Sequence, residues 1–417
     1  MPSLTNARPA SKGDKPPMNP GMDGALEGVR VLEVCQIMAG PFCGALLGDM
    51  GADVIKVEKL AGGDDARHMG RHFDGGEGHG FMNLNRNKRS LAINLKDEKG
   101  LALLRELATG ADALIENFRP GTMDRLGLGY EDLHALNPGL IYASISGYGQ
   151  TGPFRDKGGF DLVAQGLASL MSFTGEPGRP PVKIPIPVCD LNAGIYTAMS
   201  ILSAYIYKLK TGKGQRIDTS LVDAGLGYTF WQASQFFPSG EVPTPRGSAH
   251  ELAAPYQAFK CTDGYIALGA ANQSNWERTC KAIGREDLLE RDEYKTDKDR
   301  GSHYLKLAEE LDSVFETDAR DAWIERLEAE RVPCGPILDM AETFDHPQIK
   351  AREMAVDVSH PAAGKTRVLG FPPKFSETPG IVRRPSPTLG QHTDEVIKEL
   401  GKSDEEIRHL REEGVLA

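Results

Sequence analysis

The sequence predicts an α/β protein, with a parallel sheet covered by helices and a smaller α+β domain inserted into the larger one. Three observations support this. Short β-branched runs alternate with helical segments between residues 29 and 145, the rhythm of a parallel sheet. After Pro238 a proline-rich stretch leads into a hairpin-like segment. The 417 residues also exceed the size of one ordinary domain.

The larger domain is expected to open with a β-α-β unit and to repeat it. Apolar, β-branched runs predict strands, and apolar residues at helical spacing predict the helices between them. The expected strands cover 29–34, 53–58, 90–95, 113–116 and 140–145, and residues 216–221 resume the chain after a break at 211–215. The expected helices cover 40–50, 99–109, 122–126, 162–170 and 192–209.

The smaller domain is expected over residues 226–335. A hairpin at 256–268 turns at Asp263-Gly264, and helices follow at 273–283, 303–315 and 320–330. Residues 1–24, rich in Pro, Gly, Asn and Lys, are expected to be a flexible arm. The large domain then covers 25–225 and resumes over 336–417.

Charge and composition narrow the function. The chain has 48 Lys and Arg against 59 Asp and Glu, a formal net charge of −11, which disfavours nucleic acid or an anionic membrane as partner. It has no apolar run of membrane-spanning length and no secretory signal pattern, so we expect a cytoplasmic protein. Six scattered cysteines form no C-x-x-C pair, so we expect buried thiols and no metal site.

Several motifs of common enzyme classes are absent. The first strand is followed by a segment with one glycine, Cys35–Pro41, instead of G-x-G-x-x-G, and no P-loop occurs. This disfavours dinucleotide and ATP binding. The sequence also lacks H-E-x-x-H and G-x-S-x-G, which disfavours a zinc peptidase and a serine hydrolase.

One aspartate stands out in Gly158-Gly159-Phe160-Asp161, directly before an apolar helix. Asp161 suits a helix N-cap, because its side chain can accept from the free amide groups of the first turn. It equally suits a nucleophilic carboxylate that forms an acyl intermediate with a thioester. The residue pattern alone leaves both interpretations open.

A series of ordered motifs resembles the class III CoA-transferases, the CaiB/BaiF family. The motifs are Leu32–Pro41, Gly51–Glu58, Asn85–Ser90, Ile115–Gly121, Ser146–Pro153, Gly159–Asp161, Asp190, Thr211–Gln215, Pro255–Phe259 and Leu389–Thr393. The resemblance covers nearly all of residues 26–417. It favours the nucleophile over the N-cap for Asp161.

The resemblance implies a Rossmann-like large domain whose parallel sheet is built from both chain ends, with the small domain inserted, and two protomers interlocked as a homodimer or a heteromer. It also implies that Asp161 attacks an acyl-CoA, and that the resulting anhydride becomes an aspartyl-CoA thioester, which an acceptor carboxylate then attacks. Acyl-CoA and a carboxylic acid are the substrates, and no tightly bound cofactor is required. Backbone N–H groups of Gly158 and Gly159 are candidate donors to the reacting carbonyl oxygen.

The same resemblance, with the clustered cations after the strands, suggests the CoA-binding residues. They are Ile37, Met38, Ala39, Lys59, Arg86, Lys88, Arg89, Ile93, Asn94, Lys96, Asn117, Phe118 and Arg125. The cations would bind the phosphates of CoA. Alternatively, the charged residues form a solvated face and the apolar ones pack in the core.

The segments Gly247–His250 and Pro255–Ile266 are similar to the branch that uses succinyl-CoA as donor and dicarboxylates as acceptors. Arg86, Arg246 or His250 would hold the free carboxylate of such an acceptor. Asp190 is interpreted as a helix cap in preference to a catalytic group.

Two alternatives remain. The first is an α-methylacyl-CoA racemase, which Phe160 disfavours because racemases carry Gly-His-Asp there, although His134 lies upstream. The second is a non-catalytic subunit of a heteromeric CoA-transferase.

Overall fold

A computed structural model describes residues 24–71, 76 and 78–417. The predicted N-terminal arm, residues 1–24, lies almost entirely outside the described residues. The chain divides into two compact units. The first comprises residues up to 164, 187–228 and 353–417, and the second comprises 165–186 and 229–352. The second unit thus differs from the predicted small domain, because it also takes in residues 165–186 and ends at 352 instead of 335.

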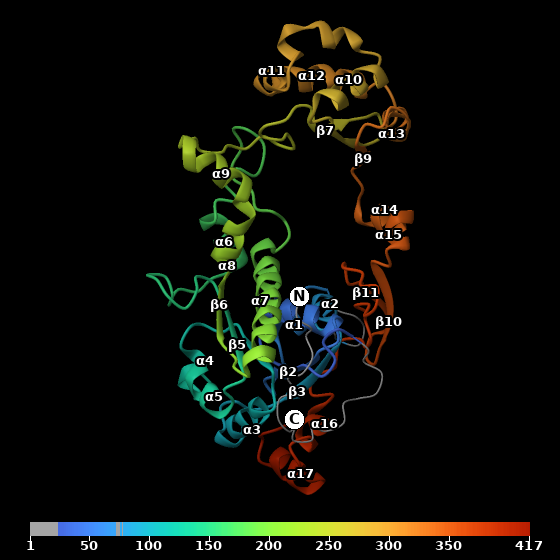
Figure 1. The fold of residues 1–417 in the computed structure, drawn as a ribbon. Coiled ribbons are helices and arrows are strands. Elements are labelled where there is room, and N and C mark those ends of the chain that lie inside the picture. Colours follow the sequence, from blue (N-terminus) through green and yellow to red (C-terminus); the bar gives the residue numbers. More distant parts are fainter. Residues whose placement is uncertain (1–23, 72–75, 77) are drawn as a thin grey trace, which may run out of the picture. The chain divides into compact units, whose positions relative to one another are not determined.

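The first unit is built on a six-stranded parallel sheet in the order β3-β2-β1-β4-β5-β6 (Figure 1). The strands are β1 (Arg30–Val34), β2 (Asp53–Glu58), β3 (Lys88–Ala92), β4 (Ala113–Glu116), β5 (Ile141–Ser146) and β6 (Arg216–Ser220). The order reverses between β1 and β4, and such a switch point is where open α/β sheets bind ligands at the carboxyl ends of their strands. The predicted α/β class is confirmed.

Helices and short helical turns connect these strands or follow the last of them. They are α1 (Ala39–Asp49), η1 (Asp65–His68), α2 (His79–Leu84), α3 (Glu98–Thr109), α4 (Thr122–Arg125), α5 (Tyr130–Leu136), α6 (Asp161–Leu167), α7 (Val188–Thr211), α8 (Leu221–Leu226) and η2 (Gly227–Thr229). The long helix α7 packs beside α1 (Figure 1). Leucines of α3 and α5 pack in a core with Leu32, Ile55, Leu114 and Tyr142 of the sheet.

The prediction that both chain ends build the parallel sheet is wrong. All six strands lie between residues 30 and 220, and the carboxyl-terminal segment instead adds an antiparallel hairpin, β10 (Ala355–His360) with β11 (Gly364–Leu369), and two helices, α16 (Thr393–Lys398) and α17 (Asp404–Glu412). These helices complete the core with Val396, Ile397 and Ile407. The carboxyl end therefore adds no parallel strand, although Leu416 forms an isolated antiparallel bridge with Ile93, directly after β3.

The other face of β1 and its neighbours carries charge. Glu33 alternates with the core residues Leu32 and Val34, and it is fully buried with Lys56 and Lys88 at 2.9 and 2.7 Å. Helix α1 lies close above it, since a Cβ on Gly44 would approach the Glu33 carboxylate to 1.9 Å. A buried charge requires such pairing, so glycine and two lysines are needed together here.

The second unit is α+β. A three-stranded antiparallel sheet joins β7 (Tyr256–Lys260), β8 (Tyr265–Gly269) and β9 (Cys334–Pro336). Its helical elements are α9 (Phe230–Ser239), α10 (Gln273–Ala282), η3 (Glu286–Glu290), η4 (Asp292–Tyr294), α11 (Asp297–Ser302), α12 (Tyr304–Phe315), α13 (Arg320–Ala329), α14 (Met340–Asp345) and α15 (Pro347–Ala351). The predicted hairpin is confirmed. Aromatic residues such as Phe259, Trp276 and Phe315 form a separate core.

Three smaller observations bear on function. Five of the six cysteines are buried free thiols, and Cys334 is half-buried. Among residues 24–71, 76 and 78–417, no cluster of three His, Cys, Asp or Glu side chains has a geometry that could hold a metal ion. In the same part of the chain, no helix has both the length and the apolar character needed to cross a bilayer.

Candidate active site

Asp161 begins α6, and its carboxylate lies at the amino end of α7. The Cys189 N–H donates to Asp161 Oδ1 at 2.8 Å, and the Asp190 N–H contacts the same oxygen at 3.4 Å. Helix α7 has 24 residues, and its free N–H groups and dipole favour negative charge at this end. The amino end of α7 therefore fixes one carboxylate oxygen and stabilises its charge.

Two glycines determine where Asp161 lies. Gly147 follows β5 by one residue, Gly159 precedes Asp161 by two, and their backbones are in contact. A Cβ on Gly147 would lie 2.6 Å from the Gly159 Cα, and a Cβ on Gly159 would lie 2.4 Å from the Gly147 Cα. Only glycine fits at either position, so this contact anchors the segment that carries Asp161 to the end of the sheet.

A cavity of about 330 Å³ lies beside this segment. It is lined by residues that follow β1, β4 and β5, by Gly159 and Phe160, and by Asp190 of α7. Three predicted residues of the β1–α1 segment, Ile37, Met38 and Ala39, line it, as do Asn117 and Phe118. The sequence therefore predicted one wall of this cavity.

The β1–α1 segment is held in an unusual conformation. Ile37 has a φ of 68°, a region that β-branched residues rarely adopt. Its N–H donates to Asp64 Oδ1 at 2.9 Å, and Asn117 exchanges two hydrogen bonds with the backbone of Gln36 at 2.8 and 2.9 Å. Loops after β2 and β4 thus fix this backbone at the edge of the cavity.

A second cavity, of about 460 Å³, lies at the carboxyl ends of β1, β2 and β3. Lys59, Ile93, Asn94 and Lys96, four of the residues predicted to bind CoA, line it, and Phe118 and Gln36 line both cavities. Lys59 and Lys96 are exposed. Lys59 has an exposed ion pair with Asp65 at 2.5 Å, a kind of pair that contributes little to stability and that a stronger anion can displace. Arg125 lies outside the lining but donates to Thr122, which belongs to it.

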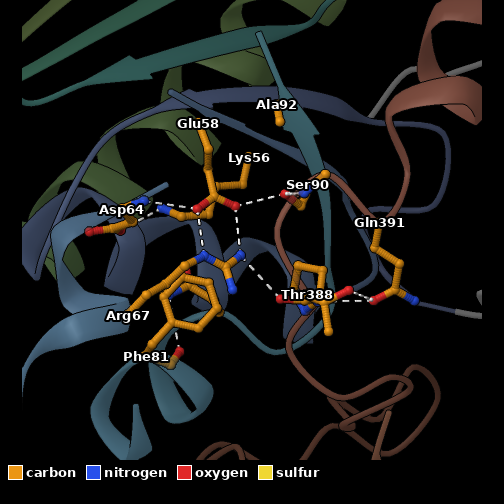
Figure 2. Close-up of polar contacts among 12 residues, drawn as sticks. Lys56, Glu58, Asp64, Arg67, Phe81, Ser90, Ala92, Thr388 and Gln391 are labelled. Atoms are coloured by element: carbon orange, nitrogen blue, oxygen red, sulfur yellow. Dashed lines mark hydrogen bonds and ion pairs between the residues drawn. The ribbon is translucent and has the colours of Figure 1, made fainter. Parts of the chain in front are cut away.

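Glu58 lines this second cavity, and a buried network of polar contacts surrounds its carboxylate (Figure 2). Arg67 donates to both Glu58 oxygens at 2.8 Å, and the Ser90 hydroxyl donates at 2.7 Å. Burial would raise the pKa of Glu58, but the hydrogen bonds of Arg67 and the charges of Lys56 and Arg67 hold it below its ordinary value. Arg67 also donates a hydrogen bond to the Pro387 carbonyl at 3.1 Å. Through Arg67, the carboxyl-terminal segment is therefore linked to Glu58 of β2.

Three predicted CoA-binding cations do not line either cavity. Arg86 is buried and paired with Asp49 at 2.6 Å, Lys88 is fully buried against Glu33, and Arg89 is buried against Asp53 at 2.6 Å. Burial of an unpaired cation is costly, so each is matched by a carboxylate inside the fold. The prediction that this cluster contacts CoA or the acceptor is therefore corrected: it stabilises the large unit.

The predicted acceptor residues Arg246 and His250 line a separate cavity of about 240 Å³ within the second unit. His250 lies edge-on to Tyr256 with ring centroids 5.2 Å apart, and Arg246 stacks over the Tyr304 ring at 4.7 Å. Of the predicted pair, Gly159 lines the first cavity, whereas Gly158 lies beside Arg119. His134 stacks on Tyr130 in α5 and lines none of these cavities.

Sequence reasoning missed several residues at the site. Gln36, Arg119, Ser146 and Gly147 line the first cavity, and the N–H groups of Cys189 and Asp190 reach Asp161. Arg119 and Gly147 lie inside motifs that were already recognised, and their position directly after a strand was the available signal. The pairing of α7 with Asp161 has no local signal, because 28 residues separate the partners.

The chain is similar along most of its length to known CoA-transferases. The chain is 38% identical to the human succinyl-CoA:glutarate CoA-transferase, over 94% of this chain and 90% of that protein. It is likewise 38% identical to a succinate–glutarate CoA-transferase of Agrobacterium fabrum, over 90% of this chain and 95% of the other. These relatives place it among the CoA-transferases.

The chain belongs to CoA-transferase family III, whose model matches residues 26–393. A crystal structure of a CaiB/BaiF family protein from Brucella suis superposes with a TM-score of 0.82 at 37% identity, covering 91% of this chain and 100% of that one. The resemblance drawn from the ordered motifs is confirmed.

Proposed function

We propose that the protein transfers CoA from succinyl-CoA to a small dicarboxylic acid through an aspartyl-CoA thioester on Asp161. The observation that carries this proposal is the Asp161 carboxylate, held at the amino end of α7 beside one cavity that shares Gln36 and Phe118 with a second, lysine-lined cavity. A carboxylate in this position is a nucleophile with a site for a long anionic thioester next to it.

The reaction proceeds in balanced steps. Asp161 attacks the thioester carbonyl, the C–S bond breaks, and a mixed anhydride and CoA thiolate result. The thiolate attacks the aspartyl carbonyl of the anhydride and releases succinate, which leaves the aspartyl-CoA thioester. The acceptor carboxylate attacks this thioester to form a second anhydride and free thiolate. The thiolate then attacks the acceptor's acyl carbon, which forms the new acyl-CoA and restores Asp161.

The N–H groups at α7 suit the middle steps. When the aspartyl carbonyl is attacked, negative charge develops on the oxygen that the Cys189 N–H already contacts at 2.8 Å. Preorganised donors of this kind stabilise the developing oxyanion without reorganisation. This assigns to α7 the task that the sequence had suggested for the backbone of Gly158 and Gly159.

CoA would occupy both cavities. Exposed Lys59 and Lys96 would bind its phosphates, with Arg125 at the rim, and the pantetheine arm would pass Gln36 and Phe118 toward Asp161. Asn94 and Asn117 offer polar contacts along this path. CoA is a substrate in this scheme, and the scheme needs no tightly bound cofactor.

The acceptor class is inferred from the relatives. Both relatives named above carry glutarate in their names. We infer glutarate or an acid of similar length as acceptor.

An interlocked dimer is part of the proposal. Helix α7 exposes Ile195, Met199 and Leu209, and α9 exposes Phe230 and Phe237, at 44–80% of their surface. Large apolar side chains exposed on successive turns are typical of surfaces that a partner covers. A second copy of this chain is the expected partner.

The test is an exchange assay. Purified protein is incubated with succinyl-CoA and a panel of carboxylic acids, and new CoA esters are detected by chromatography. We expect ester formation with dicarboxylic acids, its loss in Asp161→Ala and its retention in the control Asp223→Ala, an exposed aspartate of α8. Deuterium entry at the α-carbon without new esters would refute the proposal in favour of a racemase. Absence of any reaction with all acids would refute it in favour of a non-catalytic subunit.

A further inference from the structure

A second carboxyl group lies next to Asp161. Asp190 is the third residue of α7, and its side chain lines the first cavity together with Gly159 and Phe160. The sequence interpreted Asp190 as a helix cap, but Pro187 occupies the N-cap of α7, and the side chain that accepts from the first turn of this helix is that of Asp161. The Asp190 carboxyl therefore does not cap α7.

Asp161 and Asp190 differ in how their charge is stabilised. Asp161 accepts from the Cys189 N–H, whereas within the described part of the chain no hydrogen bond or ion pair to the Asp190 carboxyl is found. Two neighbouring carboxylates without a cation between them retain a proton, and it resides on the one with fewer donors. Burial and the charge of Asp161 accordingly raise the pKa of Asp190 to about 7.

The other ionisable groups near Asp190 do not compete for this proton. Arg119, from the segment after β4, is exposed where it lines the cavity. Cys189, its neighbour on α7, is a thiol whose pKa burial raises to about 12. A proton held by this pair of carboxyl groups thus resides on Asp190, which lines the space where the thioester would react.

We propose that Asp190 donates a proton to the CoA sulfur as the thioester is cleaved and takes it back as the sulfur attacks the aspartyl carbonyl. This inference rests on the proposed function and names a further group in the same reaction. In this proposal Asp161 is the nucleophile and Asp190 is the general acid.

The proton balance closes over each half-reaction. As Asp161 attacks and the C–S bond breaks, the Asp190 proton passes to sulfur, which leaves CoA thiol and an Asp190 carboxylate. That carboxylate then removes the thiol proton while sulfur attacks the anhydride and succinate leaves as an anion. Since an ordinary thiol has a pKa of about 8.5, a carboxyl with a pKa near 7 can protonate the thiolate and recover the proton later.

The experiment compares Asp190→Asn with wild type over pH 5.5–9. Asparagine keeps the shape but cannot exchange the proton, so kcat should fall at least about 100-fold while KM for succinyl-CoA changes less than threefold. The wild-type kcat should decline above about pH 7, as the acid is lost, and this decline should be absent in the variant. Asp223→Asn is the matched control, because Asp223 is also the third residue of its helix but is exposed and lines none of the three cavities described above.

A kcat for Asp190→Asn within threefold of wild type, with the same pH profile, would overturn the inference. If the variant fails to fold by circular dichroism, the wild-type profile and Asp190→Glu decide: a decline near neutral pH in both supports Asp190, and its absence from the wild type overturns it. Asp161→Ala separates the two proposals. Full exchange by Asp161→Ala refutes the proposed function, whereas its loss together with a normal Asp190→Asn refutes this inference alone.

Discussion

Replacement of Gly147 by alanine should displace Asp161 and slow the reaction far more than it weakens CoA binding. The added Cβ would lie 2.6 Å from the Gly159 Cα, whereas ordinary contacts begin at 3.4 Å. The two backbones must therefore separate by about 0.8 Å. Gly159 lies two residues before Asp161, so the shift reaches the nucleophile.

A misplacement of about 1 Å can cost about 100-fold in rate, so we expect kcat to fall roughly 10- to 100-fold. The CoA phosphates would bind at the second cavity, which Gly147 does not line, so KM for succinyl-CoA should change less than threefold. Initial rates of glutaryl-CoA formation, measured by chromatography at varied succinyl-CoA, separate the two constants.

The matched control is Gly80→Ala in α2, where no described atom lies within 4 Å of the added Cβ. It should keep the wild-type kcat. If Gly147→Ala also keeps kcat within twofold of this control, the glycine contact does not position Asp161, and the reasoning fails.

Three further predictions follow from the structure. Lys59→Ala and Lys96→Ala should each raise KM for succinyl-CoA about 5- to 10-fold, more at low salt, with an unchanged melting temperature, because each removes an exposed cation from the second cavity. Arg86→Met should instead destabilise the protein by about 3–5 kcal/mol in urea unfolding without weakening CoA binding, because it leaves Asp49 buried and unpaired. Burial lowers the pKa of His392 to about 4, while Ser90 N–H donates to its Nδ1. Since the unfolded state binds more protons between pH 4 and about 6.5, stability should fall as the pH drops through this window, by about 1–2 kcal/mol, and less in His392→Asn when followed by thermal melting.

Much of the sheet was predictable because its strands contain short runs of β-branched and other apolar residues and alternate with helical segments. The strand Asp53–Glu58 was predicted at its observed bounds. The strand Lys88–Ala92 was predicted two residues late, because Lys88 and Arg89 are read as surface charges. Their partners, Glu33 and Asp53, lie on other strands, and no local pattern reveals such pairing.

The boundary of the second unit was harder to predict for a related reason. Residues 165–186 belong to it, although they precede α7, which belongs to the first unit. The side chain of Gln165, at the start of this segment, forms hydrogen bonds with the backbone of Ile184 and Ile186 at its end. These residues are about twenty positions apart in the sequence. A prediction made along the sequence assigns residues 165–186 to the same domain as the elements on either side of them.

At the site, the sequence identified the residues that follow strands and misjudged the charged cluster before β3. Lys59, Lys96, Asn117 and Phe118 line cavities because they lie in the segments that follow β2, β3 and β4, at the edge of a parallel sheet where ligands bind. Arg86 precedes its strand and lies at the opposite edge. The direction of each strand distinguishes the charged residues that follow a strand, such as Lys59, from those that precede one, such as Arg86.

The most direct measurement of the central claim is capture of the aspartyl-CoA thioester. The protein is incubated with succinyl-CoA, treated with hydroxylamine or borohydride, digested, and analysed by mass spectrometry. We predict that the peptide containing Asp161 carries the hydroxamate or the reduced side chain in wild type and is unmodified in Asp161→Ala. Modification of a different residue, or exchange activity without modification of Asp161, would contradict the account.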